Sequence, residues 1–426
     1  MVYSARGTLG GASVVEFGEL LRNSRMASGM SLGELARRIK YSKSQVSKVE
    51  NGRARAGRMF ARLCDEALGT GGTLAAAVSP EPTRTEAPPP DEVWVLELDE
   101  AGTLRFTERP RAQVHAGAGA DLGYAPGRGR RPAIDDRTFA LLRKSFDDHH
   151  VLGTMTSPAL VLGQVIAHLH TLRTLAVDNP EPMRSDLLVL AARAAEYAGW
   201  MSQEAGEEAD ALRWTDRAVT LAGERDPHLA SFALFRHAEV ALYQHNPVRT
   251  IELAKLAQRD HLAGPRILGL AARCEAQGHA LAGDVGAYEK ALDRAAELLA
   301  TREPSPGPVL GPASVPDDLG LVRGWSLYDL GRPGESAELL EQHLTEVPSS
   351  ARRARARFGV RCTLAHAVNG SPEQACAVAR DVLADVAVVD SATIRLDLRE
   401  LYRTLNRWRS LPQVLDLQNE LLPLLR

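Results

Sequence analysis

The chain contains 426 residues, of which 44% are hydrophobic and 25% charged, and its formal net charge is −3 at pH 7. This length allows two or three domains with sizeable cores, and the composition is typical of a soluble globular protein. No apolar run approaches the roughly 18 residues that a membrane span needs, and residues 1–18 lack the pattern of a signal peptide. We therefore expect a cytoplasmic protein with no membrane partner.

The charge is divided unevenly along the chain. Residues 1–80 carry 12 Lys and Arg against 6 Asp and Glu, a formal charge of +6. The remainder carries 39 against 48, a formal charge of −9. A small basic region on an acidic body indicates that the basic region meets a polyanion and the body does not.

The stretch SLGELARRIKYSKSQVSKVENG contains two helix-start signals. Ser31 is followed three residues later by Glu34, and Ser42 is followed by Gln45, which is the spacing of a capping box. An apolar residue flanks each box on both sides, as a hydrophobic staple requires. Both serines are therefore expected to cap short helices.

Three short helices are predicted here, over residues 16–28, from 32 to about 40, and from 43 to about 50. The last two, joined by a tight turn, form a helix-turn-helix. Val46 and Val49 fall on the inner face of the last helix, which leaves four side chains outward: Lys43, Ser44, Ser47 and Lys48. Such short or cationic side chains can reach base edges or phosphates.

The segment LLRNSRMASGMSLGELARRIKYSKSQVSKVENGRAR resembles the XRE (phage Cro-type) helix-turn-helix family, and the likeness covers about residues 15–78. It implies a five-helix domain at 1–78 that binds double-stranded DNA with residues 43–50 as its recognition helix. Leu32 stands where the family usually has Gln, and Ala56-Gly57 where it usually has Pro. The expected DNA contacts are Arg22, Arg25, Lys43, Ser44, Gln45, Ser47, Lys48, Asn51, Arg53 and Arg55. Gln45 could cap Ser42 or read a base, but not both at once.

The middle of the chain changes character three times. Residues 79–91 are Pro-rich and polar, which predicts an extended linker. Residues 93–98 alternate and are followed by a turn and a second extended run at 104–107, which predicts a small β-hairpin within the segment 92–134. The Gly- and Arg-rich stretch 117–135 favours a solvated loop over an accessory DNA contact.

Residues 135–426 read as one helix after another, broken at regular intervals. The breaks are spaced by 40, 37, 48, 39 and 39 residues, and they lie at Gly206, Asn246, Gly283, Gly331, Gly370 and Arg409. A period just under 40 predicts stacked helical hairpins. The long interval contains the Pro-rich insertion 301–318, which predicts a loop, and helices over about 136–150 and 158–177 are expected to cap the stack.

The clearest unit, YAGWMSQEAGEEADALRWTDRAVTLA, resembles the tetratricopeptide (TPR) repeat in its spacing of small residues. We expect a mostly α-helical protein: a helix-turn-helix domain, a small β-hairpin and a TPR-like α-solenoid. The layout resembles actinobacterial XRE regulators and the peptide-pheromone-sensing TPR regulators of Gram-positive bacteria. That resemblance implies a concave face for a peptide, small-molecule or protein partner. Candidate ligand contacts are Arg236, Tyr243, Arg273 and Gln277. For the aromatic residues of this face a packing role is favoured, so the polar residues are the better candidates.

Signals for other chemistry are weak. The pairs His149-His150 and His168-x-His170 lack the i, i+4 spacing of a helical metal site. The cysteines at 64, 274, 362 and 376 form no CxxC, and reduced thiols are favoured over disulfides. No phosphate-binding loop or nucleophile elbow is present in the sequence. We therefore expect no enzyme, no cofactor and no metal.

The function predicted from these patterns is a sequence-specific transcription regulator. One domain at 1–78 offers one short half-site, so a homodimer is expected, with the repeat domain mediating dimerisation and the sensing of a ligand or protein. The alternative is a TPR-type interaction scaffold whose N-terminal domain makes only weak nucleic-acid contact.

Overall fold

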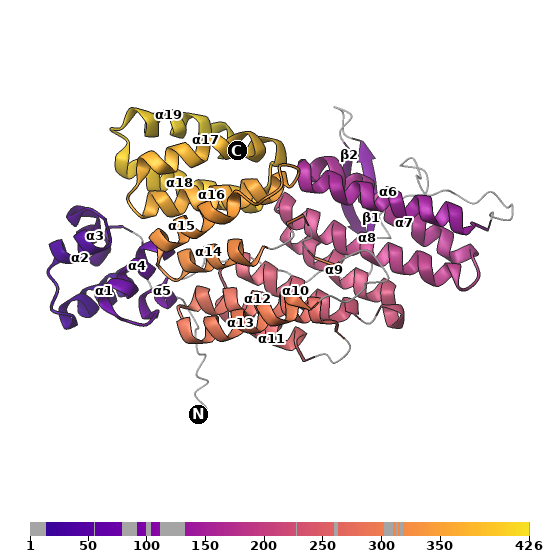
Figure 1. Ribbon diagram of the computed structural model, residues 1–426, viewed down its shortest axis with the longest axis horizontal. Helices are drawn as coiled ribbons and strands as arrows, with labels where there is room; N and C mark the ends of the chain where they lie inside the picture. The colour runs from indigo at the N-terminus through magenta and orange to yellow at the C-terminus, as the bar shows by residue number, and fades with distance from the viewer. Residues whose placement is uncertain are drawn as a thin grey trace, which may run out of the picture.

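The computed structural model describes residues 14–54, 56–78, 92–98, 104–110, 133–226, 228–259, 263–301, 310–311, 314–315 and 318–425. The described chain is mostly helical and has a small N-terminal head and a large helical body (Figure 1). The linker predicted at 79–91, the predicted DNA contact Arg55 and most of the Gly- and Arg-rich stretch lie outside the described residues.

Five helices form the described part of the head. They are α1 (Val14–Ala27), α2 (Leu32–Arg38), α3 (Lys43–Glu50), α4 (Arg58–Leu68) and α5 (Thr73–Ala77). Their core contains Phe17, Leu21, Leu35, Val46 and Val49, all buried. The predicted bounds of the last helix in the helix-turn-helix and its predicted inner face are confirmed.

A glycine on α1 lets the first and third helices of the head pack with their backbones almost in contact. A Cβ atom on Gly18 would lie 2.6 Å from the carbonyl oxygen of Val49 and 2.7 Å from that of Glu50. Neither backbone oxygen can move away without displacing α3. The position of α3 therefore depends on the absence of a side chain at residue 18.

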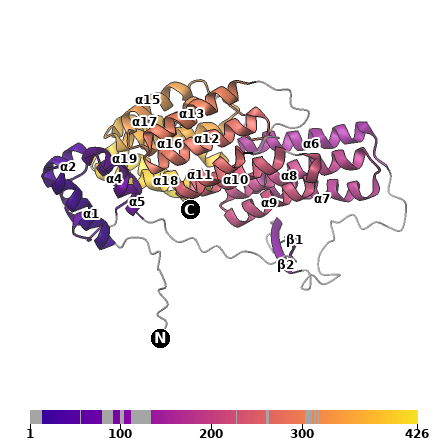
Figure 2. The ribbon, with the colours of Figure 1, turned by 90° about the horizontal axis from the view of Figure 1, so that it is seen from below.

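Two strands follow the head. Strand β1 (Glu92–Leu98) pairs antiparallel with β2 (Leu104–Pro110), and the register places Val95 opposite Thr107. The hairpin lies beneath the end of the body that contains α7 and α8 (Figure 2).

In the part of the chain that the structure describes, the body consists of seven successive helical pairs. The first pair, α6 (Asp136–Met155) and α7 (Pro158–Asp178), occupies the position predicted for a cap. The six pairs that follow are α8 (Met183–Ala205) with α9 (Glu208–Ala222), α10 (His228–Tyr243) with α11 (Pro247–Ala257), α12 (Pro265–Ala282) with α13 (Val285–Ala300), α14 (Leu319–Asp329) with α15 (Pro333–Leu344), α16 (Arg352–Val368) with α17 (Pro372–Val389), and α18 (Ala392–Leu405) with α19 (Pro412–Leu421).

The turns inside these pairs lie at the predicted breaks. Gly206, Gly283, Gly331 and Gly370 each have a φ between 82° and 91°, which only glycine adopts without strain. In the α10–α11 turn, His245 takes the left-handed conformation, and Asn246 caps α11 by accepting from the Arg249 N–H. Regular turns of this kind stack the pairs side by side.

The body curves until its first two pairs touch its last two. Arg353 on α16 donates to the carbonyl oxygen of Gly153 on α6 at 2.8 Å and to a carboxylate oxygen of Glu204 on α8 at 2.6 Å. Ser391, which caps α18, donates to the same carboxylate at 2.8 Å. Glu204 is 1% exposed, so a buried ion-pair cluster ties the beginning of the body to its end.

One helix in the described part of the chain is long and apolar enough to cross a membrane by composition, the segment Pro158–Val177 of α7. Five of its residues are fully buried in the body core and pack beneath α8: Val161, Val165, Ile166, Leu169 and Leu172. About a third of the segment is buried, on the face that packs on the body core.

The head lies against the turn side of the body, at the end of the molecule opposite α6 and α7 (Figures 1 and 2). Arg62 on α4 is 4% exposed and donates to the backbone oxygens of Ala280, Leu281 and Asp329. These carbonyls belong to the last turns of α12 and α14, where backbone oxygens lack the i+4 donor of a helix interior. Of the three, the Ala280 oxygen also accepts from the Gly283 N–H at 3.0 Å. One guanidinium from the head thus caps two helices of the body.

A second contact between head and body lies next to α3. The Arg407 guanidinium, in the turn between α18 and α19, stacks 4.3 Å from the ring centre of Tyr41. Lys40 donates to the side-chain oxygen of Asn369 at 3.1 Å. Both head residues stand in the turn between α2 and α3, so the body holds the helix-turn-helix unit in one orientation.

Candidate nucleic-acid interface and body cavity

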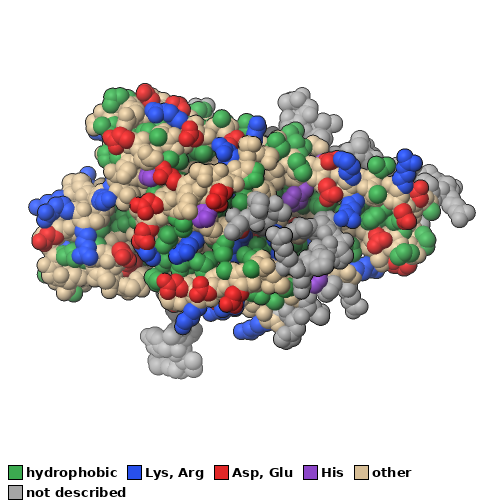
Figure 3. All heavy atoms as spheres, in the orientation of Figure 1, with side chains coloured by type: hydrophobic (Ala, Val, Ile, Leu, Met, Phe, Trp, Pro, Cys, Tyr) green, Lys and Arg blue, Asp and Glu red, His purple; other side chains and the backbone are tan. Residues whose placement is uncertain are grey.

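The side chains of α3 that were predicted to contact DNA lie on its outer face. Lys43, Ser44 and Lys48 are exposed, and Gln45 and Ser47 are half-buried. Lys and Arg side chains are grouped at this end of the molecule (Figure 3). The helix therefore presents short and cationic groups to solvent and keeps its two valines in the core.

The two predicted caps differ in detail. The Ser31 N–H donates to the Glu34 carboxylate at 2.8 Å while the Glu34 N–H donates to the Ser31 hydroxyl at 3.2 Å, so the first capping box is complete. These hydrogen bonds lower the pKa of Glu34. At Ser42 only the Gln45 N–H donates, at 3.1 Å, and within the described residues the Gln45 side chain makes no return bond. Gln45 is therefore not held at the cap.

Arg25 lies beside the C-terminal end of α3 in a buried ion pair. Its guanidinium donates twice to Glu50, at 2.6 and 2.9 Å, and the Glu50 carboxylate is 1% exposed. The bond to Glu50 raises the pKa of Arg25 above its usual value. The structure thus gives Arg25 an internal partner, which ties α1 to the end of α3.

Arg22 and Asn51 contact each other. Arg22 donates to the Asn51 side-chain oxygen at 2.6 Å, and the Asn51 amide donates to the Ser47 carbonyl oxygen at 2.7 Å. Both side chains remain exposed beside α3. Arg53 is also exposed, just beyond the helix, whereas Leu32 packs against the head core.

The concave face of the body contains a cavity of about 1060 Å³, part of which is open to solvent. Its lining comes from α6, α8, α10, α12, α14, α16 and the segment before α14. All four ligand contacts proposed from the sequence, Arg236, Tyr243, Arg273 and Gln277, lie in this lining. Two other side chains on the first helices of these pairs lie outside the lining: Met201 on α8 is in the core, and the Tyr328 hydroxyl on α14 donates to Glu400 at 2.9 Å.

Two arginines of the cavity were not identified from the sequence. Arg353 and Arg357 line it from α16, and both bond to the buried carboxylate of Glu204. Their i, i+4 spacing in RRARARF predicts that they share one helix face. Their common partner is about 150 residues away and could not be predicted from local sequence.

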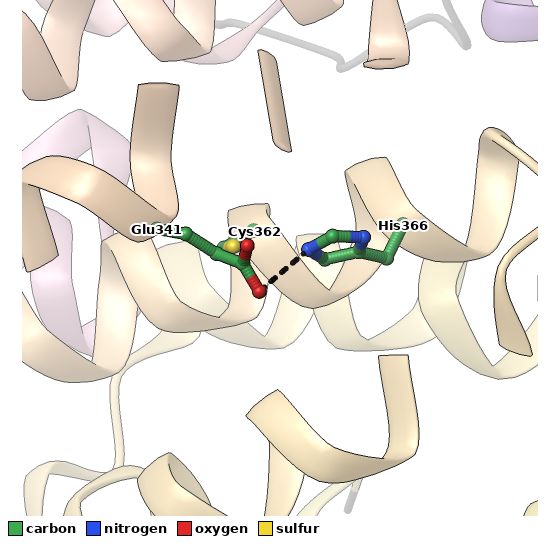
Figure 4. A group of neighbouring side chains, drawn as sticks. All are labelled: Glu341, Cys362 and His366. Carbon is green, nitrogen blue, oxygen red and sulfur yellow. Dashed lines mark ion pairs between the residues drawn. The ribbon is translucent and has the colours of Figure 1, made fainter. Parts of the chain in front are cut away.

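Glu341, Cys362 and His366 form the one group of three neighbouring metal-ligand side chains found in the described residues (Figure 4). The His366 ring nitrogen lies 3.0 Å from Glu341, and Glu341 also accepts from Gln374 at 2.6 Å. Burial raises the pKa of the Cys362 thiol to about 12, so without a metal it stays protonated. A thiolate, imidazole and carboxylate set of this kind suits zinc. The i, i+4 spacing of Cys362 and His366 is the sequence signal that could have located it.

Comparison with known proteins identifies the family of the head. Residues 16–78 match a family described as a helix-turn-helix domain. No curated protein matches the chain, and no solved structure matches it. The head is therefore a helix-turn-helix domain, the kind of domain found in DNA-binding regulators.

Proposed function

We propose that this protein is a sequence-specific, XRE-type transcription regulator that acts on double-stranded DNA in the cytoplasm. The observation that carries the proposal is the outer face of α3, where Lys43, Ser44 and Lys48 stand exposed on a rigid helix in a basic domain. Side chains of this size and charge reach base edges and phosphates in the major groove. The chain needs no catalytic step for this role.

The proposal includes a homodimer, because one head reads only one short half-site. Four apolar side chains of α6 and α7 are more than half exposed, at the end of the body far from the head: Leu141, Val151, Leu160 and Val177. Pairing of two copies through α6 and α7 would bury exposed apolar side chains and leave both heads free.

The TPR-like body is proposed to control the head through α12 and α14. Arg62 bonds to the last turns of both helices, and the same two helices line the cavity with Arg273, Gln277 and Trp325. A ligand that separates or clamps α12 and α14 would change how Arg62 is held. Control of this kind requires the ligand to bind two arrangements unequally.

The variant Lys43→Ala with Ser44→Ala tests the assignment of α3. We expect it to lose at least tenfold in affinity for a DNA fragment that the wild-type protein retains, because base contacts of this kind contribute about 1–3 kcal/mol each. The control is Lys144→Ala on the exposed face of α6. It removes the same charge as Lys43→Ala and should bind DNA normally.

Unchanged binding by the double variant would show that α3 is not the recognition helix. Retention of DNA without any preference in sequence would favour the alternative, a TPR-type interaction scaffold with weak nucleic-acid contact.

A further inference from the structure

Three side chains from two neighbouring helices of the body converge at one point. Glu341 stands on α15, and Cys362 and His366 stand one turn apart on the facing side of α16 (Figure 4). The ligand atoms of the three side chains all lie within 4.8 Å of one another. Two ligands of one tetrahedral zinc ion are about 3.3–3.5 Å apart, so small side-chain movements bring all three to one ion.

The His366 imidazole lies beside Glu341 without a hydrogen bond to it. Its Nε2 atom is 3.0 Å from a carboxylate oxygen, yet in the described part of the chain this atom has no hydrogen-bond partner. The oxygen is therefore close enough for a hydrogen bond but lies off the direction that one needs. Two ligands of one ion are arranged in this way, because the ion takes the lone-pair direction of each. His366 is 8% exposed, so bulk water does not satisfy this nitrogen.

The point between these atoms is reached from the side of Glu341. The Glu341 side chain is 37% exposed, whereas Cys362 is fully buried. No preformed cavity is required, because a zinc ion lies between its ligand atoms at about 2.0–2.3 Å from each, and they close around it. Gln374 on α17 donates to the Glu341 carboxylate at 2.6 Å, and a hydrogen bond of this kind orients a carboxylate ligand.

The chemistry of the three ligands selects the metal. A thiolate and an imidazole suit zinc, whereas Mg²⁺ and Ca²⁺ take oxygen ligands. The thiolate and the carboxylate together carry two negative charges, which balance a divalent ion. Cys362 gives its proton to the solvent when the sulfur–metal bond forms. Three protein ligands leave the fourth position of a tetrahedral ion to water.

We propose that Glu341, Cys362 and His366 bind one Zn²⁺ ion, with water as the fourth ligand. The ion joins α15 to α16, which belong to successive helical pairs of the body. A ligand that binds only the folded chain stabilises it, so zinc should raise the unfolding temperature. The expectation of no metal rested on histidine pairs elsewhere in the chain and did not consider this group.

The test uses the reduced full-length protein after a chelator has removed bound metal. Competition against a chromophoric chelator measures zinc affinity, and thermal unfolding measures the effect of zinc on stability. We expect one Zn²⁺ ion per chain with a dissociation constant below about 1 µM, and no competition from Mg²⁺ or Ca²⁺. Co²⁺ in place of zinc should give the sulfur-to-cobalt charge-transfer absorption of a thiolate ligand, and added Zn²⁺ should remove it.

Variants locate the site. Cys362→Ser should remove the charge-transfer absorption and weaken zinc binding at least about tenfold, since even the loss of an outer-shell partner costs that much. The matched control is Cys376→Ser on α17, which also replaces a buried cysteine and should bind zinc as the wild type does. If Cys362→Ser fails to fold, Glu341→Gln tests the affinity from a partly exposed position. Its control is Glu338→Gln, exposed on the same helix.

The outcomes that overturn the proposal are distinct from those that bear on DNA. No zinc binding, or weak binding of several ions that Cys362→Ser and Glu341→Gln leave unchanged, would overturn it. A cobalt spectrum without the sulfur band would also do so, because Cys362 would then not be a ligand. Every arm is free of DNA, so a failure here leaves the proposed function standing, and a protein without DNA preference can still confirm the metal site.

Discussion

The head and the body use cationic side chains in opposite ways. On the outer face of α3, Lys43 and Lys48 are exposed, and Arg53 is exposed just beyond it. In the body, Arg236, Arg273 and Arg353 are at most 6% exposed and each bonds to a carboxylate. Exposed cations attract a polyanion at long range, whereas buried and paired cations fix the shape of a cavity and discriminate between small ligands. The two regions are therefore suited to different partners.

The largest effect is expected where the ring of helices closes. Glu204→Ala leaves Arg353 and Arg357 without their buried carboxylate, and we expect a loss of about 3–5 kcal/mol in the free energy of unfolding of the body. Urea unfolding followed by circular dichroism measures it. The control is Glu252→Ala, whose side chain is 62% exposed, with an expected change within about 0.5 kcal/mol. Equal losses in the two variants would mean that the cluster does not hold the body closed.

Low pH should lower the folding stability of the body through protonation of Glu204. Burial raises the pKa of Glu204, but the positive charges of Arg357 and Arg353 together lower it by more. The resulting pKa is about 2, against an ordinary 4.5. Between these values the unfolded chain binds more protons than the folded one, so the stabilisation is present above pH 4.5 and is lost as the pH falls toward 2. It amounts to about 3 kcal/mol. Urea midpoints at pH 5, 4 and 3 should fall less steeply in Glu204→Gln; parallel curves would contradict this pKa.

The close contact between α1 and α3 gives a smaller effect, confined to the head. Gly18→Ala places a methyl group against two backbone oxygens, and we expect a loss of about 1–3 kcal/mol with weaker DNA binding. Gly33→Ala is the control, because a Cβ atom there would meet no atom within 4 Å. Thermal unfolding of the two variants should separate them. Normal stability of Gly18→Ala would show that the helices are not packed this tightly.

The smallest expected effect comes from one exposed cation of the head. Arg53→Gln should weaken binding to all duplexes alike and reduce the slope of log affinity against log salt by about one unit, because one phosphate contact is lost. Fluorescence anisotropy at several salt concentrations measures the slope. An unchanged slope would remove Arg53 from the interface.

Sequence predicted the features that depend on neighbours along the chain. The cap at Ser31 needs only Glu34, three residues away, and the turns at Gly283 and Gly370 need only a residue that tolerates positive φ. The helix-turn-helix and the spacing of the helical pairs follow from such local rules. The four residues proposed for ligand contact share one cavity because each stands on the first helix of a pair.

Contacts between distant segments could not be predicted. Arg25 reads as a phosphate contact in isolation, but Glu50 on another helix provides its partner. Arg62 gives no signal that it caps α12 and α14, and the cluster around Glu204 exists only because the body curves far enough to bring α8 to α16 and α18. The curvature depends on the packing of every pair, and no single motif encodes it.

The central claim is that the exposed face of α3 selects a DNA sequence. The most direct measurement incubates the full-length protein with a pool of random duplexes and sequences the fragments that it retains. We predict that one short motif, present as two half-sites, is enriched. The variant Lys43→Ala with Ser44→Ala should lose that enrichment. Retained fragments with the same composition as the starting pool, bound only at low salt, would contradict it.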